Sequence, residues 1–228
     1  VDSAGNISLV NALDYETATS YTLTLNASDG VNITSSDLII TVDDVNEAPS
    51  LSNTLAASSF AENISTGTTI ANASASDPES QAITYSLSGT GSENFAVDSS
   101  GNVTLIAGLD YETASSYNLT LSASDGVNTI TNTIAISISD VNEAPSLSSS
   151  LAATSFAENT ATGSTIATAS ASDPESQTIT YSLSGAGSEN FAVDSSGNIT
   201  LASSLDYETT TSYSLTLTAS DGTNSTSN

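Results

Sequence analysis

The sequence of 228 residues contains no Cys, His, Lys, Arg, Met or Trp, and only 5% of its residues are aromatic. Without Cys or His the chain has no disulfide, zinc finger, thiol nucleophile or imidazole base. Without Lys or Arg nothing neutralises phosphate, which excludes DNA, RNA and anionic lipid as partners. No apolar run reaches about 18 residues, so no membrane-spanning helix is predicted. The chain has no initial Met and no signal peptide, and we expect it to be a segment of a longer protein.

The residues that are present form a repeat of 96 residues. Its motifs are Leu-Asp-Tyr-Glu-Thr at 13–17, 109–113 and 205–209, Phe-Ala-Glu-Asn at 60–63 and 156–159, and Asp-Val-Asn-Glu-Ala-Pro at 44–49 and 140–145. One period has the size of a small domain rather than of a solenoid repeat. We therefore predict three domains: a partial repeat over 1–48, a complete repeat over 49–144, and a repeat lacking its last strand over 145–228. Residues 44–49 and 140–145 are the predicted linkers.

Within a repeat the pattern is that of β-strands. Residues 84–87, 117–123 and 129–139 alternate apolar with small polar residues, as in strands that have one buried face. Asp98-Ser-Ser-Gly-Asn102 between two short apolar runs predicts a hairpin turn, with Gly101 at a positive φ. About seven short strands with a turn every 8–12 residues predict an all-β fold, an antiparallel Greek-key β-sandwich.

All of the charge is negative, from 26 Asp and Glu residues, and these acids occur singly in short motifs at turns and repeat ends. Carboxylates mixed with Asn side chains and loop carbonyls, without any soft ligand, are ligands that suit a hard cation such as calcium. The Asp-Val-Asn-Glu tract joins two repeats. A cation bound there would cross-link them.

Five motifs together resemble the calcium-site motifs of cadherin repeats: Ala-Glu-Asn, Asp-Pro-Glu, Leu-Asp-Tyr-Glu, Ala-Ser-Asp-Gly and Asp-Val-Asn-Glu-Ala-Pro. The resemblance covers the whole chain, and the motifs appear in the family's order. It implies tandem immunoglobulin-like β-sandwiches in an elongated array, with calcium in the junction between consecutive domains and up to three ions in each junction.

The resemblance also implies which residues are metal ligands. The second junction would use Glu62, Asp110, Glu112, Asp140, Asn142 and Glu143 from the repeat above, and Asp173, Glu175 and Asp221 from the repeat below. The first junction would use Asp14, Glu16, Asp44, Asn46 and Glu47, with Asp77, Glu79 and Asp125. Asp29 would serve the preceding junction, and Glu158, Asp206 and Glu208 the following one.

Two departures from the family pattern leave the number of ions open. Tyr replaces the usual Arg in Leu-Asp-Tyr-Glu, and Glu replaces Asp at two places, the linker (Glu47, Glu143) and the Asp-Pro-Glu motif (Glu79, Glu175). A longer side chain still reaches calcium but changes how its oxygens bind.

The first functional hypothesis is a calcium-rigidified stalk or filament of an extracellular, cell-surface protein that serves cell adhesion. Its partners would be calcium and further copies of itself, through homophilic or lateral filament contacts. The composition is similar to that of bacterial surface adhesins. The alternative is an array of carbohydrate-binding modules that hold matrix or host glycans.

An enzyme is not expected. A glycosidase pair at Asp110 and Glu112 is disfavoured because the same pair recurs at every linker without a cleft-forming insertion. A Ser nucleophile has no His or Lys base to activate it.

Overall fold

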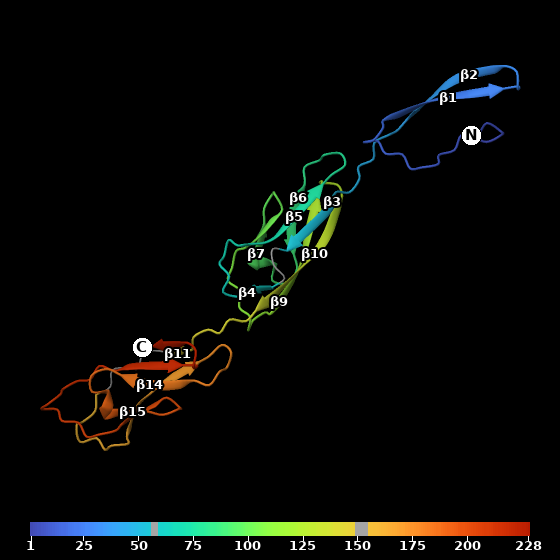
Figure 1. Ribbon diagram of the computed structural model, residues 1–228. Coiled ribbons are helices and arrows are strands. Elements are labelled where there is room, and N and C mark those ends of the chain that lie inside the picture. The colour runs from blue at the N-terminus through green and yellow to red at the C-terminus, as the bar shows by residue number, and fades with distance from the viewer. Residues whose placement is uncertain (56–58, 149–154) are drawn as a thin grey trace. The chain divides into compact units, whose positions relative to one another are not determined.

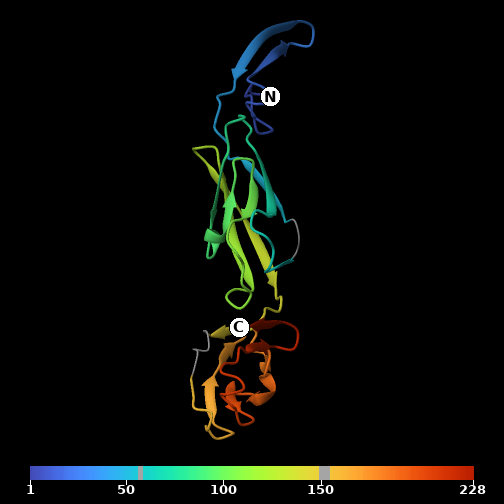
Figure 2. The same ribbon diagram turned by 90° about the vertical axis from the view of Figure 1, so that its left-hand side faces the viewer.

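The computed structural model describes residues 1–55, 59–148 and 155–228 (Figures 1 and 2). Its regular elements are β-strands apart from two short 3₁₀ helices, which confirms the predicted all-β class. The chain divides into two compact units, residues 1–109 with 116–138 and residues 110–115 with 139–228. The Asp110-x-Glu112 motif therefore groups with the second unit. No helix in the described ranges is long and apolar enough to cross a membrane.

Residues 1–48 contain one antiparallel hairpin, formed by β1 (Ser20–Ser28) and β2 (Ile33–Thr41). Its apolar side chains remain open to solvent, since Leu23, Leu25 and Leu38 are about two-fifths exposed. This part of the chain has strand pairing but little core.

Residues 49–144 form two four-stranded sheets, the arrangement expected of a β-sandwich. One sheet has the order β4-β10-β9-β6, and the other the order β3-β5-β8-β7. The strands and the one helical turn are β3 (Ser50–Leu55), β4 (Ser59–Ala61), β5 (Thr69–Ser76), β6 (Thr84–Ser88), η1 (Ser92–Asn94), β7 (Phe95–Val97), β8 (Asn102–Leu105), β9 (Ser116–Ser124) and β10 (Thr129–Ser139).

The core of residues 49–144 follows from the period-2 pattern. Along β9 every second residue is buried, and along β10 the buried residues are Ile134, Ile136 and Ile138. Ile70 and Leu105 from the other sheet are fully buried as well. The strands predicted over 84–87, 117–123 and 129–139 are confirmed as β6, β9 and β10.

The predicted hairpin turn joins β7 to β8. Gly101 has φ +83°, and the carboxylate of Asp98 accepts hydrogen bonds from the backbone N–H groups of Ser100 and Asn102 and from the Asn102 side chain. The side-chain bond from Asn102 is the main reason that the pKa of Asp98 lies below its ordinary value. Asp98 thus shapes the turn.

Residues 145–228 form three smaller sheets with the orders β11-β13, β12-β16-β15 and β14-β17-β18. Phe191, Ile199 and Leu201 form the centre of the core. The elements are β11 (Ser146–Ser148), β12 (Thr165–Thr168), β13 (Ser170–Ser172), β14 (Thr180–Ser184), η2 (Ser188–Asn190), β15 (Phe191–Val193), β16 (Asn198–Leu201), β17 (Thr216–Ser220) and β18 (Ser225–Ser227).

Candidate metal centre

The first linker is held by the side chain and backbone of Asn46. Its Nδ2 donates to the Asp125 carboxylate at 2.8 Å, and its backbone carbonyl accepts from Nδ2 of Asn128 at 3.1 Å. Its Oδ1 accepts a hydrogen bond from Gln81. Three contacts from two loops fix the residue at the middle of the Asp-Val-Asn-Glu tract.

The second linker repeats this arrangement 96 residues later. Asn142 donates to Asp221 at 2.8 Å, accepts from Asn224 at its carbonyl at 2.8 Å, and accepts from Gln177 at Oδ1. The hydrogen bond from Asn142 is the main cause that holds the pKa of Asp221 below its usual value. Asp221 is therefore ionised at neutral pH.

Acidic side chains converge in three places, two of them at these linkers. In each of three groups the carboxylate oxygens lie within 4.8 Å of one another: Glu16, Asp44 and Glu79; Glu112, Asp140 and Glu175; and Glu158, Asp206 and Glu208. The first two groups are the same positions one repeat apart, so the same geometry occurs twice. Like charges at this spacing repel each other, and the chain has no Lys, Arg or His to offset them.

The Asp-Pro-Glu loops contain buried carboxylate oxygens of the kind that a hard cation binds. In the described part of the chain, one carboxylate oxygen each of Asp77, Glu79, Asp173 and Glu175 is buried without a hydrogen-bond partner. A buried acceptor without a partner is costly and needs an explanation. A bound cation would supply the missing interaction at all four oxygens.

At the first linker the carboxyl groups of Glu47 and Glu79 interact and shift each other's pKa in opposite directions. The hydrogen bond to Glu79 raises the pKa of Glu47 to about 7, with further contributions from desolvation and from the negative charges of Glu79 and Glu16. The same hydrogen bond lowers the pKa of Glu79. The Glu47 backbone N–H also donates to Glu79 at 3.3 Å.

The other predicted ligands lie in the same loops but mainly organise their own turns. Asp14 and Asp110 accept from the backbone N–H three residues on, Asp77 and Asp173 from the N–H four residues on, and Asp29 and Asp125 from N–H groups of their Asp-Gly turns. Glu62 is buried, with 5% of its surface exposed. Glu158 accepts from the Tyr207 backbone N–H at 2.9 Å.

Sequence reasoning missed four residues that position the linkers: Gln81, Gln177, Asn128 and Asn224. Each Gln ends a Ser-Asp-Pro-Glu-Ser-Gln motif, and each Asn follows an Ala-Ser-Asp-Gly motif by two residues. Their recurrence at 96 residues was the available signal. Oδ1 of both linker Asn residues accepts a hydrogen bond from one of these Gln side chains.

The donor set fits calcium. It consists of carboxylate, carboxamide and carbonyl oxygens, several ligands come from each loop, and some of their oxygens are buried and unpaired. No His is present and no Cys is available, so the set does not suit zinc or copper.

The comparisons with known proteins identify the family. A model of the cadherin domain matches residues 57–139 and 152–228. Protocadherin Fat 4 of Mus musculus is 33% identical over 233 aligned residues, which cover 95% of this chain and 5% of that protein. Protocadherin gamma-A2 of Homo sapiens is 31% identical, over 79% of this chain and 21% of that protein. The chain thus spans a small part of these relatives.

Solved structures similar to this chain belong to the same family. Extracellular cadherin domains 1–5 of protocadherin gamma B2 match with a TM-score of 0.61 at 29% identity, over 95% of this chain and 45% of that one. Extracellular domains 3–6 of the same protein match with a TM-score of 0.58 at 29% identity, over 96% of this chain and 57% of that one. The relatives named here are cadherins, which gives the carbohydrate-binding alternative no support and agrees with a chain that is not an enzyme. The chain belongs to the cadherin family and consists of tandem cadherin-type β-sandwich repeats.

Proposed function

We propose that this chain is a calcium-binding segment of an extracellular adhesion protein, in which calcium at the linkers stiffens a run of cadherin repeats. One observation carries the proposal. The triad Glu16, Asp44 and Glu79 recurs as Glu112, Asp140 and Glu175, and in both copies the Glu of the Asp-Pro-Glu loop has a buried oxygen without a partner.

Each triad takes one acid from the Asp-Tyr-Glu motif, one from the linker and one from the Asp-Pro-Glu loop of the next repeat. An ion held by all three would tie the linker to the repeats on both sides. Bound calcium supplies positive charge that offsets the repulsion among these acids. Without it the acids repel one another, and the linker is expected to be less rigid.

The remaining ligands of the proposed site follow from the same repeat. Glu158, Asp206 and Glu208 form a triad within residues 139–228, and they are the counterparts of Glu62, Asp110 and Glu112. We infer that Glu62 and Asp110 join the second linker site in the same way. The second linker site is completed by Asp140, Asn142, Glu143, Asp173 and Asp221. Their counterparts at the first linker are Asp44, Asn46, Glu47, Asp77 and Asp125, and Asp14 is the counterpart of Asp110. Asp29 corresponds to Asp125 one repeat earlier.

The role in adhesion and the extracellular location rest on the family. The relatives are protocadherins, and one related structure is described as a protocadherin gamma B7 cis-dimer. For this chain we propose contacts with further copies of itself once calcium is bound. Because the chain carries a net charge of −26, such contacts need bound cations to reduce the repulsion.

The test is thermal unfolding of the chain during a calcium titration that starts in chelator. Extracellular sites of this type have dissociation constants of roughly 10⁻⁴–10⁻³ M. At ~10 mM calcium, one such site stabilises the folded state by about 1–3 kcal/mol, which is a rise of roughly 5–20 °C in the melting temperature of a 100-residue domain.

A matched pair of variants separates a site from general charge. Glu175→Gln removes a triad carboxylate, whereas Glu189→Gln makes the same change at an exposed acid of η2, outside the triads. Glu175→Gln should raise the melting temperature in chelator, because one repelling charge is gone. It should also reduce the rise in melting temperature that calcium causes. Equal behaviour of the two variants would show that calcium acts only by screening.

Self-association is tested by sedimentation of the same chain with calcium and with chelator. Dimers or larger species that form only with calcium support the adhesive role. A monomer under both conditions at high protein concentration contradicts self-contacts through this segment while leaving the calcium site standing.

A further inference from the structure

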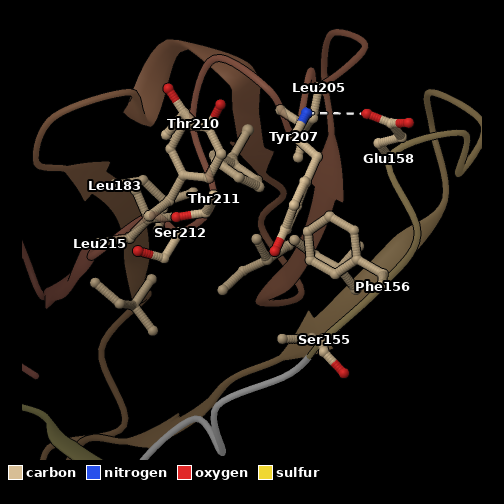
Figure 3. A pocket seen from close by; sticks show the side chains of 16 residues that line it. Ser155, Phe156, Glu158, Leu183, Leu205, Tyr207, Thr210, Thr211, Ser212 and Leu215 are labelled. Carbon is tan, nitrogen blue, oxygen red and sulfur yellow. Dashed lines mark hydrogen bonds between the residues drawn. The ribbon is translucent and has the colours of Figure 1, made fainter.

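The chain contains only two Gln residues, Gln81 and Gln177, and each donates its side-chain N–H to Oδ1 of a linker Asn. The two Gln residues are 96 residues apart, so the contact recurs with the repeat. No cationic side chain can serve as a donor, because the chain has no Lys, Arg or His. Elsewhere a carboxylate accepts from the backbone, as Figure 3 shows for Glu158 and the N–H of Tyr207 at 2.9 Å. At the linker Asn the donor is a neutral carboxamide.

The hydrogen bond from Gln177 fixes the last part of the Asn142 carboxamide. Nδ2 of Asn142 donates to the Asp221 carboxylate at 2.8 Å and to the Glu143 carbonyl at 3.0 Å. A carboxamide has two N–H donors, so both of them are used and the orientation of the group is set. Its oxygen then accepts from Gln177. The first linker has the same three contacts one repeat earlier, between Asn46 and its partners Asp125, Glu47 and Gln81.

The loop that carries each Gln contains a strained residue directly before it. Ser80 and Ser176 have φ of +61° and +60°, and they are the only non-Gly residues with a positive φ in the part of the chain that the structure describes. A side chain disfavours this left-handed conformation. Asp173 closes the second loop, since its carbonyl accepts from the Ser176 N–H at 3.1 Å and its carboxylate from the Gln177 N–H at 2.9 Å. Strain that recurs at one loop position points to a functional constraint.

A calcium ion on Oδ1 of Asn142 would meet the Gln177 N–H at the same oxygen. Calcium binds an oxygen at about 2.3–2.6 Å, and a hydrogen-bonded proton lies about 1.9–2.0 Å from its acceptor. Both place positive charge beside one atom, so they repel each other. The ion and the Gln side chain therefore compete for this oxygen.

We propose that Gln81 and Gln177 are positioning residues that take the place of a cation at the linker Asn. At low calcium each Gln holds its linker Asn on the Asp-Pro-Glu loop of the following repeat, and calcium displaces the Gln as its concentration rises. The Gln thereby sets the calcium concentration at which the linker becomes rigid. This inference rests on the proposed function, because it takes each linker to be a calcium site.

The experiment compares Gln177→Ala with the unaltered chain by NMR of the isotope-labelled protein, in a calcium titration that starts in chelator. A neutral hydrogen bond changes an equilibrium constant by a factor of about two to ten. In chelator the side-chain amide protons of Asn142 and the backbone amide of Glu143 should exchange about two- to tenfold faster in the variant. Calcium should bind the second linker of the variant about two- to tenfold more tightly. In the unaltered chain, calcium should accelerate exchange of the Gln177 side-chain protons, because it displaces them.

The chain offers three comparisons. The first linker keeps Gln81 in the variant, so its calcium response should not change. Thr178→Ala alters the exposed neighbour of Gln177 and should leave both exchange and calcium binding as they are. Gln177→Glu keeps the length of the side chain but replaces the N–H donor with an oxygen, so it should accelerate exchange in chelator and also bind calcium more tightly.

The proposal is overturned if Gln177→Ala leaves the calcium affinity of the second linker unchanged or weakens it, which is the result for a Gln that only supports the site. It is also overturned if exchange in chelator is unchanged, or if the Gln177 side-chain protons exchange equally slowly at saturating calcium. An unaltered chain that binds no calcium refutes the proposed function itself. The exchange rates in chelator then decide whether the Gln holds the linker.

Discussion

The turn between β7 and β8 allows a sharp test of the packing between the strands. Gly101 has φ +83°, and a Cβ at this position would lie 2.5 Å from the backbone oxygen of Ala73. A hydrogen bond joins the turn to β5 at this point, because the Ala73 N–H donates to the Gly101 carbonyl at 2.8 Å. Gly67 in the same repeat has φ +85°, but a Cβ there would meet nothing within 4 Å. A comparison of Gly67→Ala with Gly101→Ala therefore separates the cost of backbone strain from the cost of a steric clash.

Ala at Gly67 has to adopt the left-handed conformation, which costs about 1–2 kcal/mol. The lower entropy of the unfolded chain offsets about 0.4–1 kcal/mol of this cost. We expect a net loss of about 1 kcal/mol for Gly67→Ala. Gly101→Ala carries the same cost and also forces two strands apart, which adds about 1–3 kcal/mol. The expected difference between the variants is about 2 kcal/mol.

The measurement is hydrogen exchange of the peptides that cover β9 and β10, recorded with calcium at saturation so that the repeat unfolds as a unit. A difference of 2 kcal/mol corresponds to exchange that is about thirtyfold faster in Gly101→Ala than in Gly67→Ala. Equal rates in the two variants would refute the close approach of the turn to Ala73. The same comparison is available in residues 145–228, where Gly197 approaches Ala169 and Gly163 has open space.

Three further predictions concern charge, core and linker. Glu47 has a pKa of about 7 in the folded state against 4.5 in the unfolded chain, so in chelator the melting temperature should fall as pH rises from about 4.5 to about 7, and saturating calcium should remove this slope. A melting temperature that rises with pH in chelator would contradict the raised pKa of Glu47. Leu121→Ala empties a fully buried position and should destabilise the fold by about 2–5 kcal/mol in hydrogen exchange of β9, whereas Ile106→Ala, at a half-exposed site, should cost under about 1 kcal/mol. Asn142→Ala removes the side-chain contacts with Asp221 and Gln177, so amide exchange in residues 140–145 should accelerate; unchanged exchange would show that the carbonyl contact with Asn224 holds the linker by itself.

Strand positions were predictable where the pattern was local. The alternation over 129–139 matches β10 residue for residue, and the Asp98-Ser-Ser-Gly-Asn102 turn forms as expected because Asp caps it and Gly adopts a positive φ. These features depend on neighbours in the chain. Residues 155–157 show the limit, because they carry the same Ser-Phe-Ala sequence as β4 but form no strand.

The ligand positions were predictable only as a list. Their recurrence every 96 residues and their resemblance to one family selected the acids, but Glu16, Asp44 and Glu79 are far apart in sequence, and nothing local shows that their oxygens lie within 4.8 Å. The Asn contacts were hidden for the same reason, since Asn46 and Asp125 are 79 residues apart.

The sequence by itself determined the repeat, the β class, the turns and a charge of one sign that only an external cation can neutralise, because these depend on composition and on neighbours in the chain. Only the tertiary structure decided which carboxylate oxygens of the described residues are buried without a partner and which of them lie close together. Burial is a property of packing between segments that are distant in sequence.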